Sequence, residues 1–354
     1  MKRRRGWALL GLGALSLAGG VGLGMRPVSS GAWGWRGVTG LGLAILGLTF
    51  VVIAIRSLTA GFRPVVAGVA TVGLILLTAT AAWLLAPAVL ATAVPSTPRG
   101  DISPTEFGLE AETVTYPSNG AELAAWYVPP LNGAVVIVRH GSGSNATSVL
   151  RHAEVLARHG YGLLLTDARG HGDSTGPAMD FGWFGEADIT GSVNFLSSRP
   201  EVDPGRIAVL GLSMGGEEAI GAIGSDSRVA AVVAEGATAR TDGDKAWLAE
   251  EFGWRGRLQM SLEWLQYSVA DILSPASRPP TLASSARAAA PRPILLIAAG
   301  DLVDEQRAAE FIAGDSGNVE IWVAEGAGHM GALGQDPGLW EDTVVGFLER
   351  ALAG

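Results

Sequence analysis

The pattern Gly-x-Ser-x-Gly occurs twice in this chain, as GLSMG at residues 211–215 and GDSTG at residues 172–176. In enzymes this pattern holds a nucleophilic serine, which lies on a tight turn between a strand and a helix. The pattern alone means little here, because 50 glycines in 354 residues give about 0.5 matches by chance. The flanking sequence must therefore decide between the two serines.

The context favours Ser213 as the nucleophile. The run RIAVLGLS before it is typical of a buried strand, and MGGEEAIGAIG after it is typical of a helix. Ser174 also follows a strand-like run, but Pro177 and a loop-like segment come after it. The sequence therefore predicts the strand–turn–helix arrangement only around Ser213.

A serine is a poor nucleophile unless a base takes its proton, so a histidine is required. His329, in AEGAGHMG after the last predicted strand, is the candidate base. The other four histidines are assigned elsewhere: His140 to the loop after a strand, His171 to a turn, and His152 and His159 to the solvated surface of a helix.

An acid must orient the imidazole, and it should follow the strand PILLIAAG. Asp301 is favoured, because it is nearest the strand end and leaves room for a helix and a strand before His329. Asp304 is the alternative, although it could instead cap the next helix. Glu305 is a third candidate.

The tetrahedral intermediate needs N–H donors for its oxyanion. The backbone N–H of Met214, directly after the nucleophile, is one candidate donor. The loop after VIVRHG should supply the second from Ser142 or its neighbour Gly143. Glu217 and Glu218 open the following helix, where acidic residues suit the helix dipole.

These residues lie in a segment, 108–354, in which strand-like and helix-like runs alternate. The pattern predicts an α/β fold with a mostly parallel sheet flanked by helices. Ser118-Asn119-Gly120 predicts a hairpin turn near its start. A long insertion, 238–292, carries aromatic residues in two amphipathic runs. One interpretation is a helical lid over the active site. The other is a helical insertion whose aromatic residues only pack on the sheet, and the composition fits both equally well.

The ordered motifs HGSGSN, DARGHGDS, GLSMGG, LLIAAG and GAGH resemble those of the α/β-hydrolase superfamily. Within it, the segment GWFGEADITGSVNFLSSRPEVDPGRIAVLGLSMGGEEA resembles the bacterial esterase- and peptidase-like branch that includes dienelactone-hydrolase relatives. The resemblance covers roughly residues 108–354 and implies a Ser213–Asp301–His329 triad with donors at Met214 and Ser142. Serine chemistry of this kind needs no metal or organic cofactor, and no ligand cluster for one appears in the sequence. One departure concerns the acid, since relatives often show Gly-x-x-Asp whereas Asp301 directly follows Gly300.

The first 94 residues have a different character. They contain three uncharged apolar stretches, 6–25, 37–55 and 65–86, each about the length of a membrane-spanning helix. A cleaved signal peptide is the alternative for the first stretch, but no convincing cleavage site follows it. The Pro/Ser/Thr-rich segment 95–107 is predicted to be a linker.

The distribution of charge predicts the orientation of the chain in the membrane and excludes nucleic acid as a partner. Six Lys and Arg residues flank one predicted membrane face and three the other, so the N-terminus is expected in the cytoplasm and the following domain outside it. Residues beyond 100 carry 16 basic and 34 acidic side chains, a net charge of −18. Such a domain would be repelled by nucleic acid. The chain has no cysteine, which excludes disulfides and thiolate chemistry.

The sequence therefore predicts a serine hydrolase anchored in the cytoplasmic membrane by several spans, with its catalytic domain extracytoplasmic. Its expected substrate is a small-molecule or lipidic ester or thioester, cleaved through an acyl-enzyme. Acyl transfer or peptide cleavage by the same residues remains open. So does a catalytically silent scaffold at the membrane.

Overall fold

The computed structural model describes residues 2–29, 34–92, 97–176 and 178–353. The chain forms two compact units. One comprises Met1–Pro95 with Ser261–Pro275, and the other comprises Ser96–Met260 with Ala276–Gly354.

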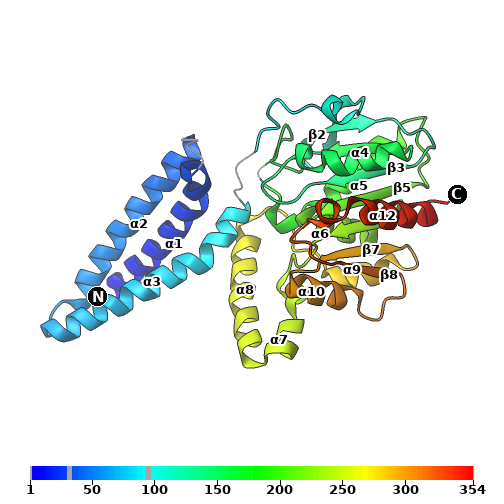
Figure 1. Ribbon diagram of the computed structural model, residues 1–354. Helices are drawn as coiled ribbons and strands as arrows, with labels where there is room; N and C mark the ends of the chain where they lie inside the picture. The colour runs from blue at the N-terminus through cyan, green and yellow to red at the C-terminus, as the bar shows by residue number, and fades with distance from the viewer. Residues whose placement is uncertain (1, 30–33, 93–96, 177, 354) are drawn as a thin grey trace. The chain divides into compact units, whose positions relative to one another are not determined.

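The second unit is built on an eight-stranded sheet in the order β1-β2-β4-β3-β5-β6-β7-β8 (Figure 1). The pairs β1/β2 and β2/β4 are antiparallel, and every other neighbouring pair is parallel. The predicted hairpin joins β1 and β2, with positive φ at Asn119 and Gly120. The strands are β1 Glu112–Ser118, β2 Ala121–Val128, β3 Val135–Arg139, β4 Gly162–Thr166, β5 Ile207–Leu212, β6 Val229–Glu235, β7 Ile294–Ala299 and β8 Val319–Ala324.

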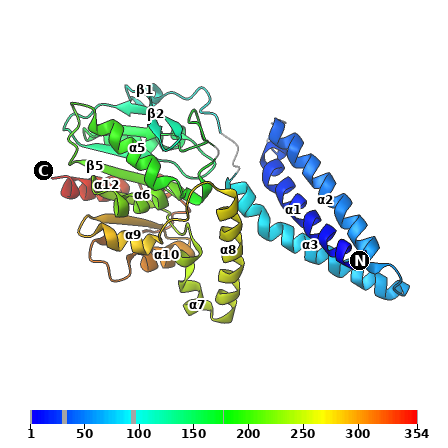
Figure 2. The same cartoon turned by 180° about the vertical axis from the view of Figure 1, so that it is seen from behind.

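Helices cover both faces of this sheet, as a parallel sheet requires. Neighbouring strand residues alternate between two apolar cores: Val136 and Val138 face the α4/α12 side, and Val135 and Ile137 face the α5/α6/α9 side. Figures 1 and 2 show these two faces in turn. The helices are α4 Leu150–Arg158, α5 Gly185–Ser197, α6 Met214–Ser225, α9 Leu282–Ala289, α10 Val303–Ala313, α11 Ala332–Gln335 and α12 Pro337–Ala351, with short 3-10 turns η1 Pro104–Phe107, η2 Ala146–Val149, η3 Asp180–Gly182 and η4 Asp242–Lys245.

The insertion between β6 and β7 is helical, as the sequence predicts. It contains α7 (Trp247–Phe252) and α8 (Trp254–Leu273), while α9 at its end packs against α6 as part of the regular fold. Among its aromatic residues, Phe252, Trp254 and Trp264 are exposed and Tyr267 is buried.

The other unit contains α1 (Lys2–Ser29), α2 (Trp35–Thr59) and α3 (Pro64–Thr92). Three helical segments, Arg3–Gly24, Trp35–Thr59 and Pro64–Thr92, are long and apolar enough to cross a membrane. Their number agrees with the three predicted spans. Among the described residues, most of the exposed large apolar side chains lie on these three helices, a pattern typical of membrane-spanning helices.

Glycines explain how α1 and α2 pack. A Cβ on Gly40 would lie 2.5 Å from the Cα of Gly24, and one on Gly20 would lie 2.7 Å from the Ala44 nitrogen. Small residues let the two backbones approach closely, which is a common way for helices to associate in lipid. Gly20 and Gly24 of α1 are therefore packing residues.

Candidate active site

Ser213 occupies a strained turn between β5 and α6. Its φ of 52° and ψ of −121° lie outside the backbone regions that residues other than glycine readily adopt. The flanking glycines are sterically required: a Cβ on Gly211 would lie 2.1 Å from the carbonyl oxygen of Gly215, and one on Gly215 would lie 2.7 Å from that of His140. The turn thus has the geometry of a nucleophile elbow.

His329 lies in the loop after β8, next to this turn. Its Nε2 is 2.9 Å from the Oγ of Ser213. Gly236, at the end of β6, makes room for the imidazole, because a Cβ there would lie 2.9 Å from Cε1 of His329. The structure brings together the two residues that the sequence pairs as nucleophile and base.

The acidic partner of His329 is Glu305, so the expectation of Asp301, with Asp304 as alternative, is wrong. The Nδ1 of His329 donates to Oε1 of Glu305, and Oε2 of Glu305 accepts from the backbone N–H of Ala299 at 3.0 Å. The chain turns after β7 so that Asp301 and Asp304 face solvent, whereas Glu305, in the first turn of α10, is 4% exposed.

Hydrogen bonding sets the protonation of this pair. The bond to Glu305 raises the pKa of His329 above its usual value, and it outweighs the opposing effect of burial. Burial alone would raise the pKa of Glu305, but the hydrogen bonds from His329 and Ala299 lower it. Glu305 is therefore a carboxylate near neutral pH, and it favours the tautomer of His329 whose Nε2 can accept the Ser213 proton.

The loop after β3 passes directly over the nucleophile. A Cβ on Gly141 would lie 3.2 Å from that of Ser213. Within the described residues, the backbone N–H groups of Ser142 and Met214 donate to no protein acceptor. The N–H of Gly143 instead donates to Nε2 of His171 at 3.1 Å. Of the two predicted loop donors, Ser142 is thus the one still able to bind an oxyanion.

Part of the segment expected to be a linker is bonded to this loop. Thr97 donates its hydroxyl to the Gly143 carbonyl at 3.0 Å. The Nδ2 of Asn145 donates to the carbonyls of Thr97 and Pro98, at 3.0 and 2.9 Å. Arg99 is buried and forms a 2.8 Å ion pair with Asp167. No local sequence pattern predicts these long-range bonds.

The second Gly-x-Ser-x-Gly serine is structural. Ser174 is buried, its hydroxyl donates to the Asp167 carbonyl at 2.8 Å, and it accepts from the Ala124 N–H at 2.8 Å. Both hydrogen-bonding roles of the hydroxyl are therefore used within the protein.

The remaining histidines divide into three buried ones and one at the surface. His140 lies at the end of β3, where its Nδ1 bonds the Gly141 carbonyl and its Nε2 the Ala168 N–H. His171 is also buried, and His159 is partly exposed and pairs with Glu341 at 2.7 Å. His152 was expected at the surface, but it is 6% exposed. Its spacing of three and four residues from Val149, Val155 and Leu156 places it on the apolar face of α4.

Glu217 and Glu218 are also more deeply buried than their place at a helix start suggests. Glu218 forms a buried ion pair with Arg139 at 2.5 Å. Glu217 accepts from the backbone N–H groups of Thr238 and Ala239 at 3.1 and 2.9 Å, and burial raises its pKa to about 7. The two carboxylates therefore connect α6 to β3 and to the segment after β6.

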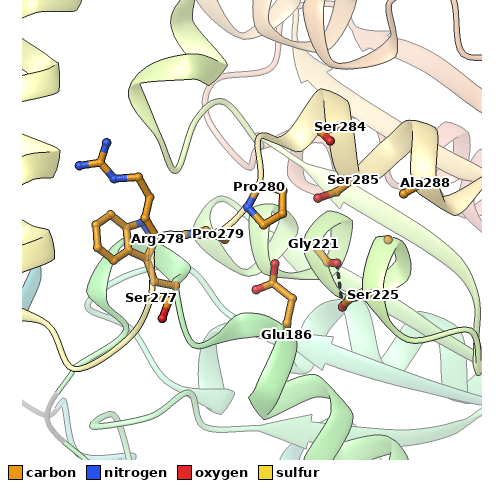
Figure 3. A pocket seen from close by; sticks show the side chains of 12 residues that line it. Glu186, Gly221, Ser225, Ser277, Arg278, Pro279, Pro280, Ser284, Ser285 and Ala288 are labelled. Atoms are coloured by element: carbon orange, nitrogen blue, oxygen red, sulfur yellow. Dashed lines mark hydrogen bonds between the residues drawn. The ribbon is translucent and has the colours of Figure 1, made fainter.

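A cavity of about 330 Å³ opens beside the nucleophile. It is lined by Gly141, Ser142, Ser144, Ser148, His152, Leu212, Ser213, His329 and Met330. Another pocket of similar size lies against α5, α6 and α9, with Glu186 and Ser285 in its wall, and contains none of the Ser213, His329 and Glu305 side chains (Figure 3). Among the described residues, no group of three or more His, Asp and Glu side chains could hold a metal ion.

Comparisons with known proteins agree with this architecture. Residues 131–292 match a family model described as serine aminopeptidase S33, a segment that contains Ser213. An esterase from Pyrococcus furiosus superposes with a TM-score of 0.58 at 25% identity, covering 74% of this chain and 98% of that one.

Curated relatives match a shorter segment. The uncharacterized protein YfhR of Salmonella typhi is 30% identical over 122 residues, which cover 32% of this chain and 41% of that protein. A thiohydrolase of Aspergillus aculeatus is 33% identical over 110 residues, covering 30% and 35%. The matched segments thus span less than half the length of these relatives.

The sheet order, the elbow and the matching family model lead to one assignment. The chain belongs to the α/β-hydrolase superfamily.

Proposed function

We propose that this protein is a membrane-anchored serine hydrolase that cleaves a small ester or thioester through an acyl-enzyme. One observation carries the proposal: the hydrogen-bonded series from the Ser213 hydroxyl through His329 to the Glu305 carboxylate. A serine, a base and an orienting acid in contact are the requirements for nucleophilic acyl transfer.

The reaction follows from these contacts. Ser213 Oγ attacks the substrate carbonyl while its proton moves to Nε2 of His329, and the N–H groups of Met214 and Ser142 stabilise the oxyanion. His329 then gives the proton to the leaving alkoxide or thiolate. A water molecule, deprotonated by His329, attacks the acyl-enzyme, and the carboxylic acid leaves as Ser213 recovers its proton.

The lining of the cavity supports an uncharged, compact substrate. Among the described residues that line it are serines and histidines but no Lys, Arg, Asp or Glu, and its 330 Å³ volume is at the small end for ligand pockets. A long acyl chain would leave these polar groups unsolvated. The similarity to an esterase and a thiohydrolase supports an ester or a thioester as the scissile group.

Aminopeptidase activity is less well supported, despite the description of the matching family model. Such an enzyme must bind the ammonium group of a free N-terminus, usually through carboxylates. Among the described residues that line the cavity, none is Asp or Glu.

The membrane anchor is proposed from the three apolar helices. The bias of six basic residues against three supports a cytoplasmic N-terminus. An odd number of spans then puts the hydrolase unit on the extracytoplasmic side.

The experiment that tests the proposed function is turnover of short-chain esters and thioesters by the full-length protein in detergent, with and without an alcohol acceptor. Release of free acid by the wild type and its loss in Ser213→Ala support hydrolysis. A product that is predominantly the acceptor ester would mean that the enzyme is a transferase. Equal turnover by Ser213→Ala would reject the proposal.

A further inference from the structure

His152 lies on the buried face of α4 and borders the same cavity as Ser213 and His329. Neither of its ring nitrogens has a hydrogen-bond partner among the described residues. Nearly all buried polar side chains in proteins have at least one partner. This imidazole is therefore an exception that requires an explanation.

Packing alone does not explain it. The ring stands edge-on to Trp340, with centroids 5.2 Å apart and an angle of 73°. A phenylalanine could make the same aromatic contact without burying two polar atoms. An unpartnered buried donor or acceptor destabilises a folded protein, so the nitrogens of His152 weaken the fold unless something else binds them.

The chemical state of the ring limits what that partner can be. Burial lowers the pKa of His152 to about 4, so the ring is neutral near pH 7 and offers one N–H donor and one acceptor. A half-turn of the ring exchanges each nitrogen with a carbon and changes its outline little. A ring that borders the cavity can therefore present a nitrogen to it.

The rest of the cavity points to an uncharged partner. Ser142, Ser144 and Ser148 add hydroxyl groups to its wall, and among the described residues that line it none is Lys, Arg, Asp or Glu. A charged group on the substrate would be desolvated here without a counter-ion in the wall, which is costly. A hydroxyl or a carbonyl group can instead pair with a neutral imidazole.

We propose that His152 forms a substrate subsite and hydrogen-bonds an uncharged hydroxyl or carbonyl group on the acyl part of the substrate. The inference rests on the proposed function, because it places the acyl group in the cavity beside Ser213. It goes further by naming the substrate class: esters or thioesters of short acyl chains that carry an oxygen substituent. His152 then acts as a specificity residue.

Matched pairs of esters test this subsite. In each pair the acyl chain carries a hydroxyl in one member and a methyl at the same carbon in the other, and the pairs differ in which carbon is substituted. At one position the wild type should prefer the hydroxyl member in kcat/KM by about tenfold or more, the value of one neutral hydrogen bond to a buried group.

Three variants test whether His152 causes the preference for the hydroxyl member. His152→Phe keeps the contact with Trp340 and should bring the ratio to within about twofold. His152→Gln should restore part of the ratio, and His159→Phe, at the surface end of the same helix, should leave it unchanged. The subsite is overturned if the wild type shows no preference at any position, or if the preference survives in His152→Phe.

A binding measurement separates this proposal from the proposed function. The carboxamide analogues of the same pairs can be titrated calorimetrically into Ser213→Ala, which needs no turnover. Tighter binding of the hydroxyl member, lost when His152→Phe is added, supports the subsite even if no ester is hydrolysed. Equal binding of both members overturns the subsite even if esters are hydrolysed.

Discussion

Glu305 holds the imidazole of His329 from the first turn of α10, one residue after the solvent-facing Asp304. The additional methylene of a glutamate and its inward position on the helix bring its carboxylate to Nδ1. The proposed catalytic series is therefore Ser213–His329–Glu305.

The first prediction concerns this acid. Glu305→Gln should lower kcat by about a thousandfold or more, because the amide cannot stabilise the imidazolium and favours the wrong tautomer of His329. The matched controls are Asp301→Asn and Asp304→Asn, which should retain activity within about twofold. Steady-state kinetics on all three variants identify the acid that acts with His329. A large loss of kcat in Asp301→Asn with a small loss in Glu305→Gln would reverse the assignment.

The second prediction concerns pH. His329 must be neutral to accept the proton of Ser213, and its pKa is raised by Glu305. Activity should therefore be lost as the pH falls through a pKa above the usual value of about 6.5 for histidine. The acid limb of the kcat/KM profile measures this pKa. In Glu305→Gln the residual activity should show its acid limb at lower pH, and an unchanged limb would mean that another group controls it.

The third prediction concerns the segment that leads into the hydrolase unit. Thr97→Val removes the bond to the Gly143 carbonyl, and Asn145→Asp removes the two donors to Thr97 and Pro98. Each should lower kcat by about two- to tenfold, the value of a neutral hydrogen bond, because the Ser142 N–H would no longer be held against the oxyanion. KM should change little.

A matched control for these variants is Ser103→Ala. It removes the cap of η1 in the same segment, where the Ser103 hydroxyl bonds Thr105. Inhibition by a boronic acid, which mimics the tetrahedral intermediate, should weaken in Thr97→Val and Asn145→Asp but not in Ser103→Ala. Equal effects in all three variants would indicate general destabilisation instead of misplacement of the oxyanion donor.

The fourth prediction concerns topology. The chain has no cysteine, so a single introduced cysteine reports its own location. Glu349→Cys lies on the exposed surface of α12 and should react with a membrane-impermeant maleimide on intact cells. Ala60→Cys, exposed at the end of α2, should react only after the membrane is permeabilised. The reverse labelling pattern would contradict the proposed orientation.

Local sequence determines much of this site, and that part could be predicted. The elbow at Ser213 requires Gly211, because a Cβ there would meet the backbone of Gly215 and Gly216, which are its near neighbours in sequence. His329 could be found because only five histidines exist and one follows the last strand.

Other features depend on conformation that no short pattern encodes. Three carboxylates lie within residues 301–305, and only the course of the turn after β7 decides that Glu305 faces inward. The expectation of a solvated surface position for His152 is wrong, because its spacing fits the apolar face of α4. The bonds from Thr97 to the loop at Gly143 join segments 46 residues apart, beyond the reach of any local signal.

The central claim is that Ser213 is an activated nucleophile. Its most direct test is mass spectrometry of the folded full-length protein after reaction with a fluorophosphonate, which phosphonylates a serine only when a base removes its proton. The account predicts one adduct, on Ser213, that is absent in Ser213→Ala and forms much more slowly in His329→Ala. An unlabelled Ser213 in folded protein, or labelling at the same rate in His329→Ala, would contradict it.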